Sequence, residues 1–143
     1  MNLYDMVVEQ TIEYPKRMKY LQSENRFIET KMDSLFYVRN VHYPYGWLVG
    51  FGAPPDRHLD ILLISDKKYM LGEIVSVKIV GVFIRNDGDN KLLAVLPERE
   101  ENDYSQLPDE EKKLLLKLYP GKFDGEEWFG FTQAKEIIRA FKL

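Results

Sequence analysis

Two apolar segments joined by an Asp-Gly turn are the feature that most restricts the fold of this chain. They read IVSVKIVGVFI over residues 74–84 and KLLAVL over residues 91–96, with NDGDN between them. Both are rich in β-branched and aliphatic residues, which favour strands. Asp-Gly supplies the positive backbone dihedral angles that a tight hairpin turn needs. The sequence therefore predicts two strands connected by a short turn.

Four further short segments have the same character, and Pro, Gly, Asp or Asn separates several of them. They are residues 7–14, 26–32, 47–51 and 59–65. Many short strands with turn residues between them are typical of a β-barrel or a β-sandwich.

The pattern changes to a helical period after residue 107. Pro108 suits the first turn of a helix, the acidic residues 109–111 favour its positive end, and Pro120 ends it. Three leucines form its apolar face: Leu114, Leu115 and Leu118. A second helix is predicted within residues 132–143, with Thr132 as its N-cap. Strands followed by helices indicate the α+β class.

Length and composition narrow the functional classes. A chain of 143 residues with 45% hydrophobic content predicts a single domain over residues 1–143. The 20 basic and 23 acidic residues give a net charge of -3, which argues against nucleic acid as the main partner. No apolar run is long enough to span a bilayer and no signal peptide is evident, so we expect no membrane association and a cytoplasmic location.

The scarcity of cysteine and histidine restricts the chemistry. The chain has no cysteine, which excludes thiolate catalysis, disulfides and Cys-type zinc sites. The two histidines, His42 and His58, are too few for a histidine-based metal site, and we assign neither a role. Any bound metal is expected to have oxygen ligands.

Three aspartates stand at the ends of predicted strands. Asp60 opens the apolar segment LDILLIS, where an ionised carboxylate needs a cation, strong hydrogen bonds or a position at the wet end of the strand. Asp87 and Asp89 lie two residues apart in the turn, where both carboxylates can converge on a hard cation such as Mg²⁺. The bidentate glutamate of an EF-hand loop is missing, so we reject that motif.

The order of these motifs resembles the soluble (family I) inorganic pyrophosphatases, from about Val7 to Phe141. The matching stretches are IEYP, KY, YPYG, LDILLI and, most specifically, GVFIRNDGDNKLLAV. The resemblance implies an α+β fold with a small, closed, five-stranded OB-like barrel flanked by helices, with helices at the C-terminal end. It also implies Mg²⁺-dependent hydrolysis of diphosphate to phosphate, with Mn²⁺ as an alternative ion, and assembly into homo-oligomers.

Residue by residue, the resemblance assigns the candidate site. The metal ligands would be Asp60, Asp87, Asp89 and Glu13. The phosphate-binding residues would be Lys19, Lys31, Lys91 and Tyr119. Tyr43 and Tyr45 resemble the two active-site tyrosines, and we expect Tyr45 to take part in catalysis.

Two departures from the family signature fall at the metal cage. Pro55 and Arg57 stand where the family has its first two aspartates, and Arg57 replaces the carboxylate that activates water. At this catalytic position an arginine would repel a metal and could anchor a phosphate oxygen. It could equally form a structural ion pair with Asp56 or Asp60. We therefore expect a reduced metal site and weak or altered activity.

Two alternatives to hydrolysis stay open. The chain could be a catalytically inactive member that keeps the barrel and binds a phosphorylated ligand or a protein partner. A nucleic-acid-binding barrel ranks last, because the sequence lacks a clear pattern of stacking aromatics and basic residues.

Overall fold

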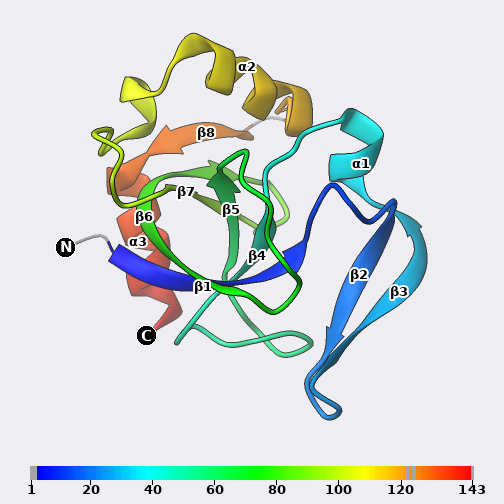
Figure 1. Ribbon diagram of the computed structural model, residues 1–143. Coiled ribbons are helices and arrows are strands. Elements are labelled where there is room, and N and C mark those ends of the chain that lie inside the picture. The colour runs from blue at the N-terminus through cyan, green and yellow to red at the C-terminus, as the bar shows by residue number, and fades with distance from the viewer. Residues whose placement is uncertain (1–2, 122, 124, 143) are drawn as a thin grey trace.

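Five strands close into a barrel at the centre of the molecule (Figure 1). The computed structural model describes residues 3–121, 123 and 125–142. The barrel strands, in spatial order, are β1 (Leu3–Gln10), β4 (Tyr45–Leu48), β5 (Asp60–Ile64), β7 (Lys91–Val95) and β6 (Ile74–Ile84). Pairing of β6 with β1 closes the barrel, and β5 and β7 run parallel while the other pairs are antiparallel. The predicted α+β class and five-stranded barrel are confirmed.

The remaining elements surround this barrel. The strands β2 (Lys16–Leu21) and β3 (Arg26–Asp33) form a separate hairpin, and β8 (Glu127–Gly130) pairs with the outer edge of β6. The helical elements are α1 (Leu35–Arg39), the 3₁₀ turn η1 (Tyr104–Gln106), α2 (Asp109–Leu118) and α3 (Phe131–Phe141). None of the helices in the described residues is long and apolar enough to cross a membrane.

The barrel strands are buried on both faces. In β5, Leu62 and Ile64 belong to a core cluster that also contains Leu115 and Leu118 of α2. The alternate residues Ile61 and Leu63 belong to a second cluster, which contains Ala134 and Ile138 of α3. Because strand side chains alternate between faces, each helix covers a different set of strand residues. Leu115 and Leu118 of the predicted apolar face of α2 are thereby buried.

The differences from the predicted elements have local causes. The segment predicted as a strand over residues 7–14 ends at Gln10, and residues 11–14 form a turn in which the Tyr14 amide donates to the Thr11 carbonyl. The strands β2 and β8 and the helix α1 were not predicted, because KRMKYL is highly charged and the other two are only a few residues long. The helix α3 begins one residue earlier than the predicted cap, where the Asp103 carboxylate accepts from the Phe131 amide.

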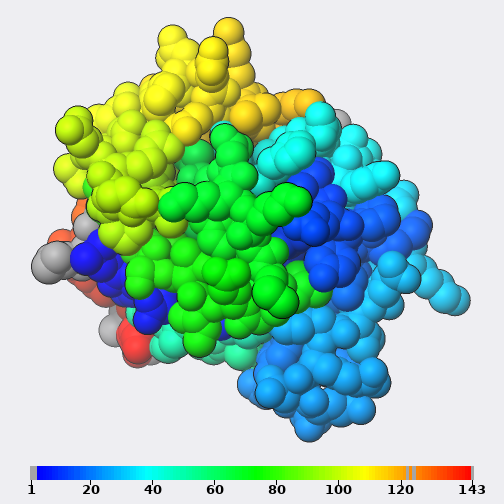
Figure 2. Space-filling view, viewed as in Figure 1, coloured from blue at the N-terminus to red at the C-terminus, as the bar shows by residue number. Residues whose placement is uncertain are grey.

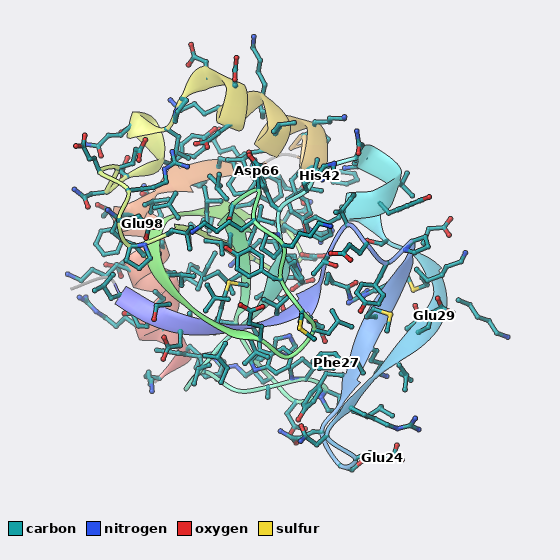
Figure 3. The ribbon with its side chains drawn as sticks, viewed as in Figure 1. Glu24, Phe27, Glu29, His42, Asp66 and Glu98 are labelled. Carbon is teal, nitrogen blue, oxygen red and sulfur yellow. The ribbon has the colours of Figure 1, made fainter. Side chains whose placement is uncertain are left out.

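The β2–β3 hairpin projects beyond the barrel (Figure 2). The buried side chain of Gln10 joins it to the end of β1, because its amide group bonds to both the N–H and the carbonyl of Met18. A second attachment is aromatic: Tyr20 and Phe27 pack against Trp47 of β4. Figure 3 shows Phe27 on the hairpin, whose tip carries Glu24. The hairpin therefore lies beside the barrel as a separate two-stranded sheet.

Candidate functional site

The ammonium group of Lys91 lies at the centre of a buried polar cluster. It donates to Tyr45 Oη at 2.8 Å, Asp60 Oδ2 at 2.9 Å and Asp89 Oδ2 at 3.0 Å. Only 7% of the lysine side chain is exposed. Because an ammonium group has three N–H donors, these three acceptors within the described residues satisfy it completely.

The barrel topology brings these groups together. Asp60 is the first residue of β5 and Lys91 the first of β7, and the two are direct partners in the parallel pairing of these strands. Tyr45 opens the neighbouring strand β4. The following residue, Gly46, lets β4 approach β1 closely, because a Cβ atom there would lie 1.7 Å from the carbonyl oxygen of Val7. Asp60 and Lys91 therefore meet at the common start of β5 and β7, and Tyr45, which pairs with Leu62 of β5, reaches Lys91 from the antiparallel neighbour β4.

Asp60 has a second cationic partner. His58 Nε2 lies 2.8 Å from Asp60 Oδ1, and His58 Nδ1 lies 2.7 Å from the carbonyl oxygen of Asp56. Since both of these oxygens accept, the ring donates through both nitrogens and is therefore protonated in this arrangement. The hydrogen bond to Asp60 raises the pKa of His58, and burial only partly opposes it.

The Asp60 carboxylate stays ionised although it is largely buried. Burial alone would raise its pKa, but the hydrogen bond from His58 and the positive charge of Lys91 hold that pKa well below its ordinary value. The carboxylate inside the apolar strand segment is thus neutralised by two protein cations.

A second cation, Arg85, lies beside the aspartates of the turn between β6 and β7. Arg85 lies 3.6 Å from the Asp87 carboxylate and 3.8 Å from that of Asp89. Asp87 also accepts a hydrogen bond from the Asp89 amide at 2.9 Å, and this bond, with the charge of Arg85, lowers the pKa of the exposed Asp87. The Asx geometry is that of an ordinary tight turn.

A pocket of about 390 Å³ opens beside Lys91, between the barrel and the β2–β3 hairpin. Four cationic side chains line it: Arg17, Arg39, Arg85 and Lys91. The phenols of Tyr45 and Tyr119 also line it. Burial raises the pKa of both tyrosines, so each keeps its proton and can donate a hydrogen bond at neutral pH. Two carboxylates, Asp33 and Asp89, line it as well, so the four cations exceed the anions by two. The pocket thus keeps an excess of positive charge, which suits an anion.

Several residues predicted from sequence meet at this site. Asp60, Asp89 and Tyr45 bond directly to Lys91, and Tyr119 lines the same pocket while its ring stacks on Phe83. Tyr43 is separate, because it is buried in the core and lines a different cavity with Arg99 and Glu111.

Other predicted residues lie elsewhere. Lys19 and Lys31 are exposed on the β2–β3 hairpin, outside the set of described residues that line the pocket. Glu13 is exposed in the turn after β1 and lines another cavity, with His42 and Asp66. Figure 3 shows His42 and Asp66 on the side of the barrel nearest α2, away from the hairpin.

Arg57 faces the C-terminal helix. Its guanidinium donates to the carbonyl oxygen of Phe141 at 3.1 Å and lies 4.0 Å from the centre of the Phe141 ring. A cation at the carbonyl end of a helix is favourable, so these contacts give the arginine a packing role between the loop before β5 and α3. Its expected catalytic role stays a prediction.

The sequence reasoning missed the three arginines of the pocket and the role of His58. Arg85 could have been identified as a site residue, because it follows the predicted strand over residues 74–84 and stands four residues before Asp89. Arg17 and Arg39 gave no such signal, since they come from the unpredicted elements β2 and α1.

The carboxylates as arranged do not fit a bound divalent cation. Within residues 3–121, 123 and 125–142, no three histidine or carboxylate side chains gather in a way that could hold a metal. Asp60 and Asp89 share Lys91, Asp87 is held by its own turn, and Glu13 lies in another cavity. Protein cations occupy the positions next to the carboxylates where an ion would have to bind.

A buried carboxylate lies behind this cluster. Glu9 of β1 accepts from the Tyr20 amide at 3.3 Å. Burial raises its pKa, the Tyr20 hydrogen bond lowers it, and the negative charge of Asp60 raises it further, with a net upward shift. Ionised Glu9 therefore destabilises the folded chain relative to its protonated form.

Replacing Lys91 tests whether the ammonium group holds the cluster together. We expect Lys91→Met to lower the free energy of unfolding by about 3 kcal/mol, because it leaves the buried Asp60 carboxylate without one of its two cationic partners. The double variant Lys91→Met with Asp60→Asn should regain much of this loss. Urea denaturation measures both, and equal losses in the single and double variants would contradict the pairing.

Replacing Glu9 tests the raised pKa. Because its folded-state pKa lies above the ordinary value, the folded state loses stability as the pH rises from that value through the folded-state pKa. Glu9→Gln should therefore be more stable than the wild type at pH 7 and should show a flatter stability profile between pH 4 and pH 7. Thermal unfolding across this pH range is the measurement. A variant less stable than the wild type at pH 7 would show that the ionised Glu9 carboxylate stabilises the fold.

Comparison with known proteins agrees with this geometry. The family model for inorganic pyrophosphatase matches residues 6–141. The chain is 29% identical to the inorganic pyrophosphatase of Nanoarchaeum equitans, over 94% of each chain. Its fold is similar to those of inorganic pyrophosphatases from Ehrlichia chaffeensis (TM-score 0.75, 21% identity, 97% of this chain and 92% of that one) and Thermus thermophilus (0.71, 18%, 99% and 92%). The barrel, the site at its strand ends and the match over nearly all the sequence show that this chain belongs to the inorganic pyrophosphatase family.

Proposed function

We propose that this family member binds diphosphate, or another small phosphorylated anion, chiefly through its own cations, and that its Mg²⁺-dependent hydrolysis of diphosphate is weak. The observation that carries the proposal is the convergence of Arg17, Arg39, Arg85 and Lys91 on one pocket. The family relationship supports diphosphate as the ligand.

The chemistry of the lining suits a multiply charged anion. A guanidinium group can donate two parallel hydrogen bonds to a phosphate, which makes arginine a stronger and more directional anchor than lysine. The protonated phenol of Tyr119 adds a neutral donor, whereas the Tyr45 phenol already hydrogen-bonds with Asp60 and Lys91. The net charge of -3 is therefore compatible with a local positive site.

Ligand binding requires an exchange at Lys91. Its three donors are already used, so a phosphate oxygen must displace one acceptor. Asp89 is the exposed one of the two carboxylates, with 56% of its side chain accessible against 12% for Asp60. Asp89 can keep a cationic partner after displacement, because Arg85 lies nearby.

Efficient Mg²⁺-dependent hydrolysis is the second candidate function, and one observation favours it. Asp60 and Asp89 both lie within 3.0 Å of the same Lys91 nitrogen, so two carboxylates approach one point. An Mg²⁺ or Mn²⁺ ion there must compete with Lys91, which predicts weak metal binding. Self-association stays a prediction from the resemblance, and a cytoplasmic location stays a prediction from the sequence features given above.

Calorimetric titration with diphosphate in the presence of a chelator tests metal-independent binding. Arg17→Ala should weaken binding about tenfold, since one charge-assisted contact contributes about 1.5 kcal/mol. The matched control is Arg26→Ala, because Arg26 is on the same hairpin but pairs with Glu24 near its tip. Lys19→Ala tests the residue that the resemblance assigns. If Arg17→Ala and Arg26→Ala bind alike, the pocket is not the site, and no binding without metal refutes the proposal.

Phosphate release separates weak from efficient hydrolysis. With saturating diphosphate and increasing Mg²⁺, we expect a rate at least about 100-fold below that of an ordinary pyrophosphatase assayed beside it, the loss typical of a missing general base. Asp89→Asn should lower any Mg²⁺-dependent rate further. A wild-type rate equal to that of the reference enzyme would establish the second candidate.

A further inference from the structure

We propose that the pocket accepts an organic phosphate, in which a short aliphatic group is esterified to the phosphate or diphosphate and lies against an apolar wall. This inference rests on the proposed function and specifies its ligand. The apolar wall consists of Met32 at the end of β3 and Leu35 and Val38 of α1.

The apolar wall is accessible and lies in the same pocket as the cations. Met32 is 61% exposed and Val38 is 63% exposed. Single exposed apolar residues are common on protein surfaces and need no explanation. Here, however, two of them line one concave site together with Arg17, Arg39 and Lys91. A ligand with a charged end and an apolar end would match both sides at once.

The size of the pocket also exceeds the needs of inorganic diphosphate. At about 390 Å³, the cavity lies within the range that holds organic ligands. An inorganic anion can use the arginines and Lys91, but it gains nothing from removing water from the apolar wall. An alkyl group would gain free energy there in proportion to the apolar area that it covers.

The composition of the wall favours an alkyl group over a planar ring. Met32, Leu35 and Val38 carry no aromatic ring, and Phe36, which also lines the pocket, is 4% exposed and packs against Tyr45. A planar ring would lack an open aromatic face on this side. A flexible alkyl chain can follow the surface of methionine, leucine and valine side chains.

Calorimetric titration with two synthetic probes, methyl diphosphate and pentyl diphosphate, tests the inference in the presence of a chelator. The probes carry the same charged group and differ only in the length of the alkyl chain. We expect pentyl diphosphate to bind about tenfold more tightly or better, because its additional methylenes cover the apolar wall. Equal affinities would overturn the organic-ligand inference and leave the proposed function intact. Failure of both probes and of inorganic diphosphate to bind would refute the proposed function itself.

Two polar substitutions test whether the higher affinity for pentyl diphosphate comes from the apolar wall. Met32→Ser and Val38→Ser, both at exposed positions, should reduce the advantage of pentyl diphosphate at least threefold and leave the affinity for methyl diphosphate unchanged. The matched control is Met70→Ser, because Met70 is 76% exposed and lies outside the set of described residues that line the pocket. An undiminished advantage in both wall variants would overturn the inference, since the alkyl chain would then lie elsewhere.

Discussion

The buried ammonium group of Lys91 is the constraint on which the site depends. A charge in this position is tolerated only if every N–H finds a good acceptor, and the acceptors come from three separate places in the chain: Tyr45 of β4, Asp60 of β5 and Asp89 of the turn before β7. The parallel pairing of β5 with β7 places Asp60 directly opposite Lys91. The fold thus places Asp60 beside Lys91. The hydrogen bonds of Lys91 in turn hold Tyr45 of β4, the start of β5 and the turn before β7 close together.

This arrangement changes the balance of charges at the site. Each of its three aspartates has a protein cation close by, with Lys91 and His58 beside Asp60 and Arg85 beside the turn. Carboxylates that are neutralised in this way attract a divalent ion less strongly than free ones do. The pocket arginines add positive charge that can attract an anion, although Arg85 is shared with the turn and Arg39 with the Leu118 carbonyl. The proposed function therefore gives this member of the inorganic pyrophosphatase family a site for phosphoryl groups that depends less on metal.

The sequence predicted the parts of the molecule whose signals are local. The strands of residues 74–84 and 91–95 and the Asp-Gly turn followed from β-branched residues and turn chemistry, and Asp60, Lys91, Tyr45 and Tyr119 were recognised through their motifs. Arg17 and Arg39 were missed, because their places in the pocket depend on how the hairpin and the five-residue helix α1 pack against the barrel. Glu13 was assigned by a short motif, whereas the turn that begins at residue 11 directs it to another cavity. Long-range packing of this kind leaves no periodic trace in a single sequence.

The way the hairpin is attached has a consequence for the width of the pocket. Arg17 and Met32 come from the hairpin, while Arg85 and Lys91 come from the barrel, so the two walls belong to different sheets. An isolated two-stranded hairpin has little stability of its own. The hairpin is attached to the barrel by the hydrogen bonds of Gln10 with Met18 and of Glu9 with Tyr20, and by the contact of Tyr20 and Phe27 with Trp47. The width of the pocket therefore depends on these few contacts between the two sheets and not on the strand pairing of the barrel.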